Sequence, residues 1–497
     1  MKIGLIPLDE RPVNTRYPAM VAQIAGVDLF LPPRGALSRY RAPADPAQLT
    51  LWLENIAPQL DYLIVSFEML GYGSLIASRI SHESVETILA RLQVLHELKL
   101  RRPALSIVGF NLIMRISNAN SAVEEPEYWA AEGKRFFLYS QLVDRQAQGQ
   151  DVARELEQLY RILPAEHVQD FLMRRLRNHT VNLSAIQMLE RRDLQALVLS
   201  SDDTSTYGLS SSEKRALQHW VEHIDLRDSL LMYPGADEVG CALLARAVNA
   251  SHAYQPAFEI FYAVPGGEKI VAPYEDSPVS VTLERQIKAV GGKVVEKAGD
   301  FWVAVNPPSP RRCEWDLQFA AAERQERLPY LQHMVKEIQL RLDSGQAVIV
   351  ADVAYPNGAD PLLIELLLGA VDITRLAAYG AWNTAGNTIG TALAQACAAH
   401  WAATPAQQEA QQRFLLHRFL EDWGYQQEVR DETRLWMDQK FKTHHITPAS
   451  YPQVLSFIEK GLEQRLSQLP GFAGKYSLVP GSLRLPWDRL FEVDFDL

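Results

Sequence analysis

Residues 194–208 read LQALVLSSDDTSTYG, and this stretch decides the class of fold that we expect. Its aliphatic run has almost no polar alternation, which is typical of a parallel strand covered by helices on both faces. Two neighbouring acids, Asp202 and Asp203, follow where the run ends. Because neighbouring side chains of a strand point to opposite faces, the pair is either a solvated turn or a catalytic site whose two acids have different tasks.

Further runs of this kind alternate with helical patterns along the chain. Residues 82–99, HESVETILARLQVLHELK, place apolar residues at i, i+3, i+4 and i+7, as an amphipathic helix does. The alternation predicts an α/β fold with a parallel sheet. The candidate strands are residues 2–8, 28–32, 61–68, 105–113, 194–201, 229–234, 258–264, 301–305, 347–354 and 375–382.

Two architectures accommodate these strands. The favoured one is a TIM-like (β/α)8-type barrel, with an α/β catalytic domain over residues 1–400, a helical insert at about 124–192 and a mainly helical C-terminal region over 401–497. The alternative is two doubly wound Rossmann-like domains joined near residues 245–258. Both architectures place the active site at the carboxyl ends of the strands.

Composition excludes several classes of protein. The net charge of -11, without any block of Lys or Arg, argues against a nucleic-acid partner. Three cysteines far apart in the sequence give neither a disulfide framework nor zinc spacing. No apolar stretch approaches the roughly 20 residues that cross a bilayer, and the N-terminus lacks the features of a signal peptide. We therefore expect a cytoplasmic protein without a membrane partner, and a homodimer is one option for its oligomeric state.

Many predicted strands end in acids, amides, glycines or an aromatic residue. N-caps of the following helices explain part of this pattern, but they explain less well the acid pair or an exposed Trp382 beside asparagines. We interpret these strand ends as the walls of a pocket with a few placed polar groups. The residues expected to bind substrate there are Asp9, Glu10, Arg11, Asn14, Glu68, Arg79, Tyr207, Asp237, Glu238, Asp352, Asn357, Trp382, Asn383 and Asn387.

The acid pair suits general acid catalysis on a glycosidic bond. Such catalysis needs a carboxyl group that keeps its proton near neutral pH, and a neighbouring carboxylate raises the pKa of its partner. When the 2-acetamido oxygen of the substrate is the nucleophile, one carboxylate orients the acetamido N–H and an acid protonates the leaving group. Tyr207 would then bind the acetamido oxygen and Trp382 would cover its methyl group. We therefore expect a glycoside hydrolase acting on a small 2-acetamido sugar, with Asp202 and Asp203 as catalytic residues and neither metal nor cofactor.

Two alternatives stay open. A metal-dependent hydrolase or lyase would use clustered carboxylates, although no HxH or HExxH spacing is present. A sugar-binding protein without turnover would suit the architecture of two doubly wound domains. No GxSxG elbow, P-loop or GxGxxG motif follows a predicted strand, which disfavours serine hydrolases, P-loop NTPases and dinucleotide-binding enzymes.

Several motifs together resemble those of a bacterial family, domain of unknown function 4127. The resemblance covers residues 1 to about 400 and implies a shared active site without naming a reaction. The motifs are LDERPVN (8–14), RNHTVN (177–182), SSDDTSTYG (200–208), PGADE (234–238), NGAD (357–360) and GAWNTAGNTIG (380–390).

A weaker similarity joins the chain to retaining β-N-acetylhexosaminidases of the O-linked N-acetylglucosaminidase type. Those barrels carry an Asp–Asp pair at one strand end and a Trp–Asn pair at a later one. The similarity implies that Asp202 orients the acetamido group, that Asp203 is the acid/base and that Asn383 binds sugar hydroxyls. In this chain the acid pair follows the fifth predicted strand rather than the fourth, after a long helical insert.

Overall fold

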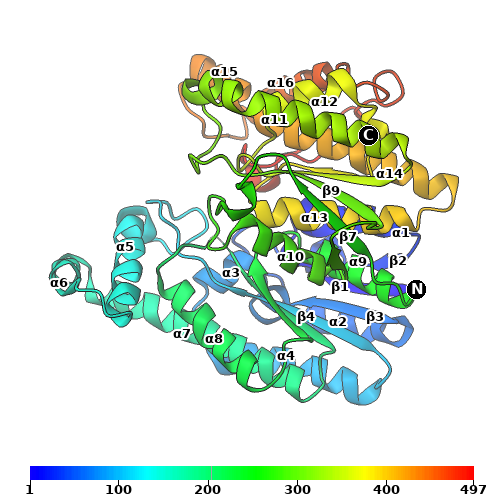
Figure 1. The fold of residues 1–497 in the computed structure, drawn as a ribbon. Helices are drawn as coiled ribbons and strands as arrows, with labels where there is room; N and C mark the ends of the chain where they lie inside the picture. Colours follow the sequence, from blue (N-terminus) through cyan, green and yellow to red (C-terminus); the bar gives the residue numbers. More distant parts are fainter. Residues whose placement is uncertain (203) are drawn as a thin grey trace. The chain divides into compact units, whose positions relative to one another are not determined.

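The computed structural model describes residues 1–202 and 204–497, and the side chains of all of these except residues 317–320. The chain has an α/β fold with two parallel sheets, and it divides into two compact units (Figure 1). Each unit is assembled from three separate stretches of the chain. The first unit comprises Met1–Glu10, Asp28–Leu243 and Tyr274–Asp276, and the second comprises Arg11–Val27, Leu244–Pro273 and Ser277–Leu497.

The sheet of the first unit has six strands, all parallel, in the order β2-β1-β3-β4-β5-β6. Its first five strands follow the doubly wound order of flavodoxin, in which the winding direction reverses between β1 and β3. All six residues of β5 are buried, as the aliphatic run predicts. The strands are β1 (Lys2–Ile6), β2 (Asp28–Phe30), β3 (Tyr62–Ser66), β4 (Ser106–Ile113), β5 (Ala196–Ser201) and β6 (Leu230–Pro234).

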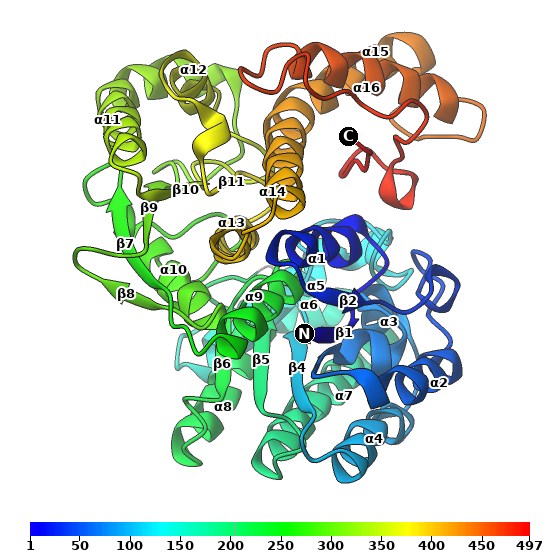
Figure 2. The ribbon, with the colours of Figure 1, turned by 90° about the vertical axis from the view of Figure 1, so that its right-hand side faces the viewer.

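Helices α2, α4, α7 and α8 lie side by side along this sheet (Figure 2). Between β4 and β5, where the helical insert is predicted, the chain forms α5, α6 and α7, which pack around Trp129, Phe136 and Phe171. The helices that carry residues of the first unit are α2 (Pro46–Ile56), α3 (Leu75–Ile80), α4 (Val85–Arg101), α5 (Trp129–Ala147), α6 (Ala153–Ile162), α7 (Ala165–Glu190), α8 (Leu209–His223) and the start of α9 (Val239–Ser251).

The sheet of the second unit repeats the doubly wound order. Its five parallel strands are arranged β11-β10-β9-β7-β8, so the winding reverses between β7 and β9. Helices α11 and α12 lie on one face and α10 and α13 on the other (Figure 2). The elements are β7 (Ala257–Tyr262), α10 (Val279–Ala289), β8 (Lys293–Val295), β9 (Phe301–Asn306), α11 (Leu317–Asp343), β10 (Ala347–Asp352), α12 (Pro361–Ala370), β11 (Ala378–Gly380) and α13 (Ala385–His400).

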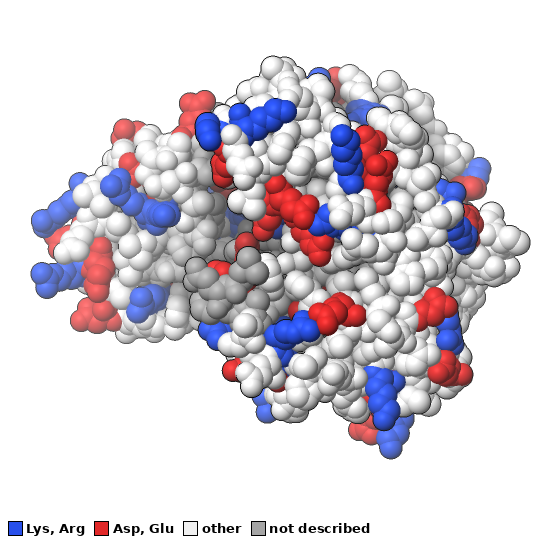
Figure 3. Space-filling model, turned by 90° about the horizontal axis from the view of Figure 1, so that it is seen from above, with Lys and Arg blue, Asp and Glu red and all other residues white. Residues whose placement is uncertain are grey.

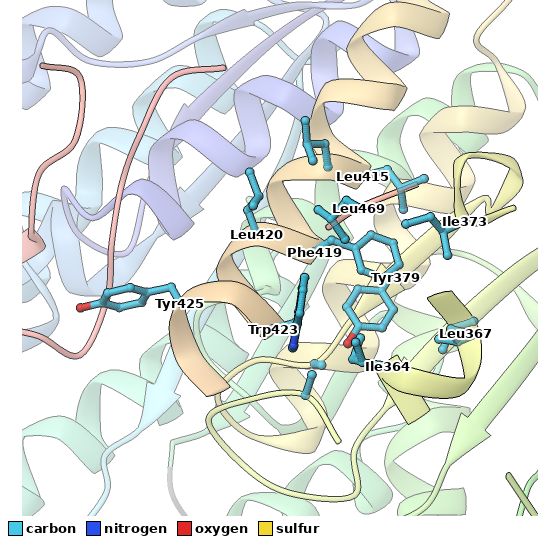
Figure 4. Packing of buried hydrophobic residues seen from close by; sticks show 14 of the residues in the cluster. Ile364, Leu367, Ile373, Tyr379, Leu415, Phe419, Leu420, Trp423, Tyr425 and Leu469 are labelled. Atoms are coloured by element: carbon cyan, nitrogen blue, oxygen red, sulfur yellow. The ribbon is translucent and has the colours of Figure 1, made fainter. Parts of the chain in front are cut away.

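The C-terminal region belongs to the second unit. A π-helical segment, Phe419–Val429, continues α14, and its Phe419 ring stacks on Tyr379 of β11 with centroids 4.2 Å apart (Figure 4). Val454 and Ile458 share one apolar core with the strands of this sheet. The predicted boundary near residue 400 therefore does not match the compact units. The remaining helices of this unit are α1 (Pro12–Ala25), α14 (Pro405–Arg418), α15 (Arg430–Phe441) and α16 (Tyr451–Leu466).

The favoured sequence prediction, a single (β/α)8-type barrel, is not what the described residues form. They form two open sheets, which are compatible with the alternative of two doubly wound domains. Both architectures alternate strands and helices, so the alternation could not separate them. All ten predicted strands are present, and the additional β8 was missed because it is a three-residue, largely exposed edge strand.

Charged side chains of both signs are interspersed over the face drawn in Figure 3, without a continuous basic patch on that face. Within the described part of the chain, no helix combines the length and apolar character that crossing a membrane requires.

Candidate functional site

A pocket lies at the carboxyl ends of β3, β4 and β5 in the first unit. It contains about 260 Å³ of empty space, part of it open to solvent. Its enclosed cavity volume is about 10 Å³, enough for about one water molecule. It is lined by Glu68, Tyr72, Leu75, Ser78, Arg79, Asn111, Leu112, Met114, Asn178 and Asp202.

Glu68 lies where the chain leaves β3 and enters a π-helical turn, Glu68–Tyr72. The Leu112 N–H donates to its Oε1 at 2.6 Å and the Ser66 hydroxyl donates to its Oε2 at 3.0 Å. Burial raises the pKa of Glu68 to about 7, and the nearby charge of Asp202 acts in the same direction. Glu68 therefore exchanges a proton near neutral pH, which is the property required of a general acid and base.

Arg79 supplies a positively charged group to the same pocket wall. Its guanidinium is almost fully buried, donates to Glu124 at 2.7 Å and forms a close ion pair with Asp202. Its Nε–H has no hydrogen-bond partner among the described residues. A buried donor without a partner is costly, so an acceptor atom placed at this N–H would be stabilising.

Local sequence explains how Arg79 is placed there. The short helix α3 that carries it starts after Ser74, whose hydroxyl accepts the Ala77 N–H at 3.1 Å as an N-cap. Gly73 before it has a φ of +96°, and a Cβ there would lie 2.6 Å from Pro43. The glycine and the cap therefore both serve the local turn and the start of α3.

The loop after β5 carries the predicted catalytic pair. Asp202 lines the pocket, whereas Asp203 lies outside the described residues. Tyr207, predicted to bind the acetamido oxygen, is not part of the pocket lining. Its hydroxyl accepts from Gln150 at 3.1 Å and its ring lies 5.8 Å from the Arg145 guanidinium, so the side chain packs on the helical insert.

Four other predicted residues of the first unit follow β1 and β6 at the same edge of the sheet, outside the pocket lining. Asp9 is fully buried, and Glu10 accepts from the Ser38 hydroxyl and from the Tyr40 N–H. Asp237 is also buried. Glu238, likewise buried, accepts the Ala236 N–H at 2.9 Å, so its carboxylate folds back on its own loop.

The remaining predicted site residues belong to the second unit. The site residues predicted from the sequence are therefore divided between the two units. Arg11 pairs with Glu492 at 2.8 Å just before α1. Asn14 lies in the first turn of α1 and is buried. The residues of this group are Arg11, Asn14, Asp352, Asn357, Trp382, Asn383 and Asn387.

The loops after β10 and β11 in this unit are held to each other. The Asn357 N–H donates to the Asn383 carbonyl at 2.9 Å, and both asparagines have a positive φ, 60° and 51°. The Asn387 amide donates to the Thr384 hydroxyl at 3.1 Å, at the start of α13. The backbone N–H of Asn357 and the side-chain amide of Asn387 thus take part in the local structure of the two loops.

Trp382 is buried, contrary to the expectation of an exposed ring. Only 3% of its surface is accessible, and Tyr17 packs edge-on against it at 6.0 Å. Arg418 lies 5.9 Å from its ring centroid and 4.0 Å above the ring of Tyr17. The reason is that the AWN segment follows β11, where α14 and the π-helical segment pack. The sequence pattern around Trp382 did not reveal this packing.

Asp352 belongs to a hydrogen-bonded network that is sealed from solvent. The Asn306 amide donates to Asp352 at 2.8 Å and to Asp360 at 3.1 Å, and the Asp360 N–H donates to Asp352 at 2.7 Å. Arg327 pairs with Asp360 at 3.0 Å. Burial and the charge of Asp360 raise the pKa of Asp352 well above its ordinary value. These contacts explain Asp352 as a structural residue.

The residues expected from sequence to bind substrate do not include Asn111 or Asn178, both of which line the pocket. Asn111 interrupts the apolar run of the strand SIVGFNLI, and a polar residue within such a run is a signal that could have been used. Asn178 belongs to the motif RNHTVN, and only the packing of α7 shows that it reaches the pocket. Among the described residues, no group of three or more His, Cys, Asp or Glu side chains could hold a metal ion.

Comparisons with known proteins give a family but no activity. A family model described as a protein of unknown function, DUF4127, matches residues 3–496, which is more of the chain than the motifs had suggested. Neither the curated proteins nor the solved structures gave a match. The family match spans both units, and the chain therefore belongs to the DUF4127 family.

Proposed function

We propose that the pocket of the first unit is the active site of a glycoside hydrolase that acts on a 2-acetamido sugar by a substrate-assisted, retaining mechanism. The observation that carries the proposal is the difference between two carboxyl groups lining one small pocket. Glu68 has a pKa of about 7, whereas Asp202 is ion-paired with Arg79. A pair of carboxyl groups in different environments is how glycosidases divide acid and base roles.

In the first step the acetamido oxygen of the substrate attacks C1 and the glycosidic bond breaks. Glu68 gives its proton to the leaving oxygen, while Asp202 accepts the acetamido N–H. In the second step the Glu68 carboxylate takes a proton from water, the water oxygen bonds to C1, and the bond between C1 and the acetamido oxygen breaks. The Nε–H of Arg79, which has no partner among the described residues, would donate to a sugar oxygen.

This assignment differs from the sequence expectation in one role. The acid/base role moves from Asp203, outside the described residues, to Glu68, which lines the pocket. The similarity to β-N-acetylhexosaminidases is one of motifs, since those enzymes are barrels and this chain has two open sheets. The proposal uses residues of the first unit, and it retains a small carbohydrate substrate and a cytoplasmic location.

The test uses chromogenic aryl N-acetylglucosaminides and N-acetylgalactosaminides of both anomers. We expect turnover by the wild type that EDTA leaves unchanged, and a loss of about 10²–10⁴-fold in Glu68→Gln, as for removal of a general acid. An aryl glycoside whose leaving group needs no protonation should recover much of this loss in Glu68→Gln but not in Asp202→Asn. The exposed acid Glu97 on α4 supplies the control Glu97→Gln. A wild type inactive on all these substrates, or a Glu68→Gln variant at the wild-type rate, contradicts the proposal.

The two doubly wound sheets favour a second candidate, a sugar-binding protein without turnover. For that function, N-acetylglucosamine or N-acetylgalactosamine at 100 times its Kd would stabilise the fold by about 2.7 kcal/mol. No product would form from the corresponding glycosides. Thermal stabilisation with turnover excludes this candidate, and stabilisation without turnover replaces the first proposal by it.

A further inference from the structure

Helix α7 of the insert carries a row of buried arginines, Arg174, Arg175 and Arg177, each less than 10% accessible. Burying a guanidinium is costly unless its N–H groups are bonded. Arg174 and Arg175 pair with Asp170 and Glu213, but all three arginines also donate to backbone carbonyl groups. The accepting carbonyls belong to segments that form or adjoin the wall of the pocket.

Arg177 binds backbone carbonyl groups on both sides of Arg79 in the sequence. Arg177 Nη2 donates to the Ser78 carbonyl at 2.7 Å, and its Nη1 donates to the Ser81 carbonyl at 2.7 Å. The Asn178 amide adds a second donor to the Ser78 carbonyl at 3.0 Å. The backbone on both sides of Arg79 is thus bound to α7, which fixes the end of the short helix α3.

Three further hydrogen bonds extend the same pattern to β4 and to the residue that follows it. Arg175 Nη2 donates to the carbonyl of Met114, a residue of the pocket lining, at 3.0 Å. Asn182 accepts the side-chain amide of Asn111 at 2.7 Å and donates to the Leu112 carbonyl at 3.3 Å. Residues of one helix therefore hold two walls of the pocket.

We propose that the helical insert is a positioning frame for the pocket, in which Arg177 is a positioning residue that acts through Arg79. The guanidinium suits this task because its rigid fork of donors reaches two carbonyl groups at fixed directions. A lysine at the same place keeps the charge but offers a single flexible ammonium group. The frame fixes the direction of Arg79, and through its ion pair the direction of Asp202.

The test compares Arg177→Lys with Arg161→Lys, a control in the same insert whose ion pair with Glu157 is exposed. A misplacement of about 1 Å costs on the order of 10²-fold in rate. With the aryl N-acetyl glycosides we expect kcat per folded molecule to fall by about that factor in Arg177→Lys, with a changed pH profile. Added guanidinium should partly restore kcat in Arg177→Ala. A merely structural role would lower the folded fraction but leave kcat per folded molecule and the pH profile unchanged, and that result overturns the proposal.

The catalytic readout rests on the proposed function, so hydrogen exchange supplies an independent one. In Arg177→Lys, the amides of residues 75–83 should exchange faster, while those of β10 in the second unit keep their rates. If the wild type lacks glycosidase activity, the proposed function fails, but faster exchange confined to this segment still supports the frame. Unchanged exchange in residues 75–83 contradicts it whether or not the wild type is active.

Discussion

The two units repeat one strand order and place buried acids at the carboxyl edge of each sheet, yet the surroundings of those acids differ. At the edge of the first sheet, Glu68 and Arg79 line a pocket, and the Nε–H of Arg79 has no partner among the described residues. At the edge of the second sheet, both oxygens of Asp352 accept N–H donors, and the adjoining Asp360 pairs with Arg327. The comparison teaches that buried acids at equivalent strand ends can line a pocket in one unit and belong to a closed hydrogen-bonded network in the other.

The largest effect that sharpens this comparison concerns Arg327. Arg327→Met removes one partner of a buried ion pair and leaves Asp360 charged in the network, which costs about 3–5 kcal/mol of unfolding free energy. Arg324→Met on the same helix breaks an exposed pair with Glu365 and costs less than about 1 kcal/mol. Urea unfolding of both variants measures the difference. Equal losses would show that the network of the second unit is not sealed.

The next effect is a pH dependence produced by Glu68. Its pKa rises from the ordinary 4.5 to about 7 on folding, so the folded state retains a proton that the unfolded state has lost. Stability therefore falls as pH rises from 4.5 to 7, by about 3 kcal/mol in all. Glu68→Gln cannot ionise, so its stability relative to the wild type should grow over this range and then stay constant. Urea unfolding at pH 5, 6, 7 and 8 measures this difference.

Asp352→Asn is the counterpart in the second unit. The amide group would direct an NH₂ at a donor, either the Asn306 amide or the Asp360 N–H. In Glu68→Gln the NH₂ can instead face the Ser66 hydroxyl, which is able to accept. We therefore expect Asp352→Asn to destabilise the fold, but less so as pH rises through the raised pKa of Asp352, because the wild type loses stability over that range. A stabilising Asp352→Asn, or a Glu68→Gln difference independent of pH, contradicts the comparison.

The smallest effect concerns the cap of α3. Ser74→Ala removes the N-cap of the helix that carries Arg79 and should cost about 1 kcal/mol. Ser84→Ala removes the equivalent cap of α4, whose residues do not line the pocket. We expect similar losses of stability from both variants, but weaker binding of N-acetyl sugars only in Ser74→Ala. Thermal unfolding with and without sugar separates the two outcomes.

Sequence patterns predicted the strands because a strand depends on a short run of neighbouring residues. Glu68, Arg79 and Asp202 could be placed after predicted strands for the same reason. An aliphatic run predicts a buried strand, and parallel strands have their carboxyl ends at one edge. The number of sheets could not be predicted, because a barrel and two open sheets share the same alternation. Burial of Trp382 depends on α14 and the π-helical segment, which pack beside it from later in the sequence. Its neighbours in sequence contain no sign of that contact.

The assembly of each unit from three stretches of chain limits how the gene can evolve. The chain passes between the units after residues 10, 27, 243, 273 and 276. Tandem domains can be lost or exchanged by one recombination event at their linker, but no single breakpoint in this gene separates the two units. We therefore expect the pair to be inherited together, and the single family model spanning residues 3–496 agrees with that expectation.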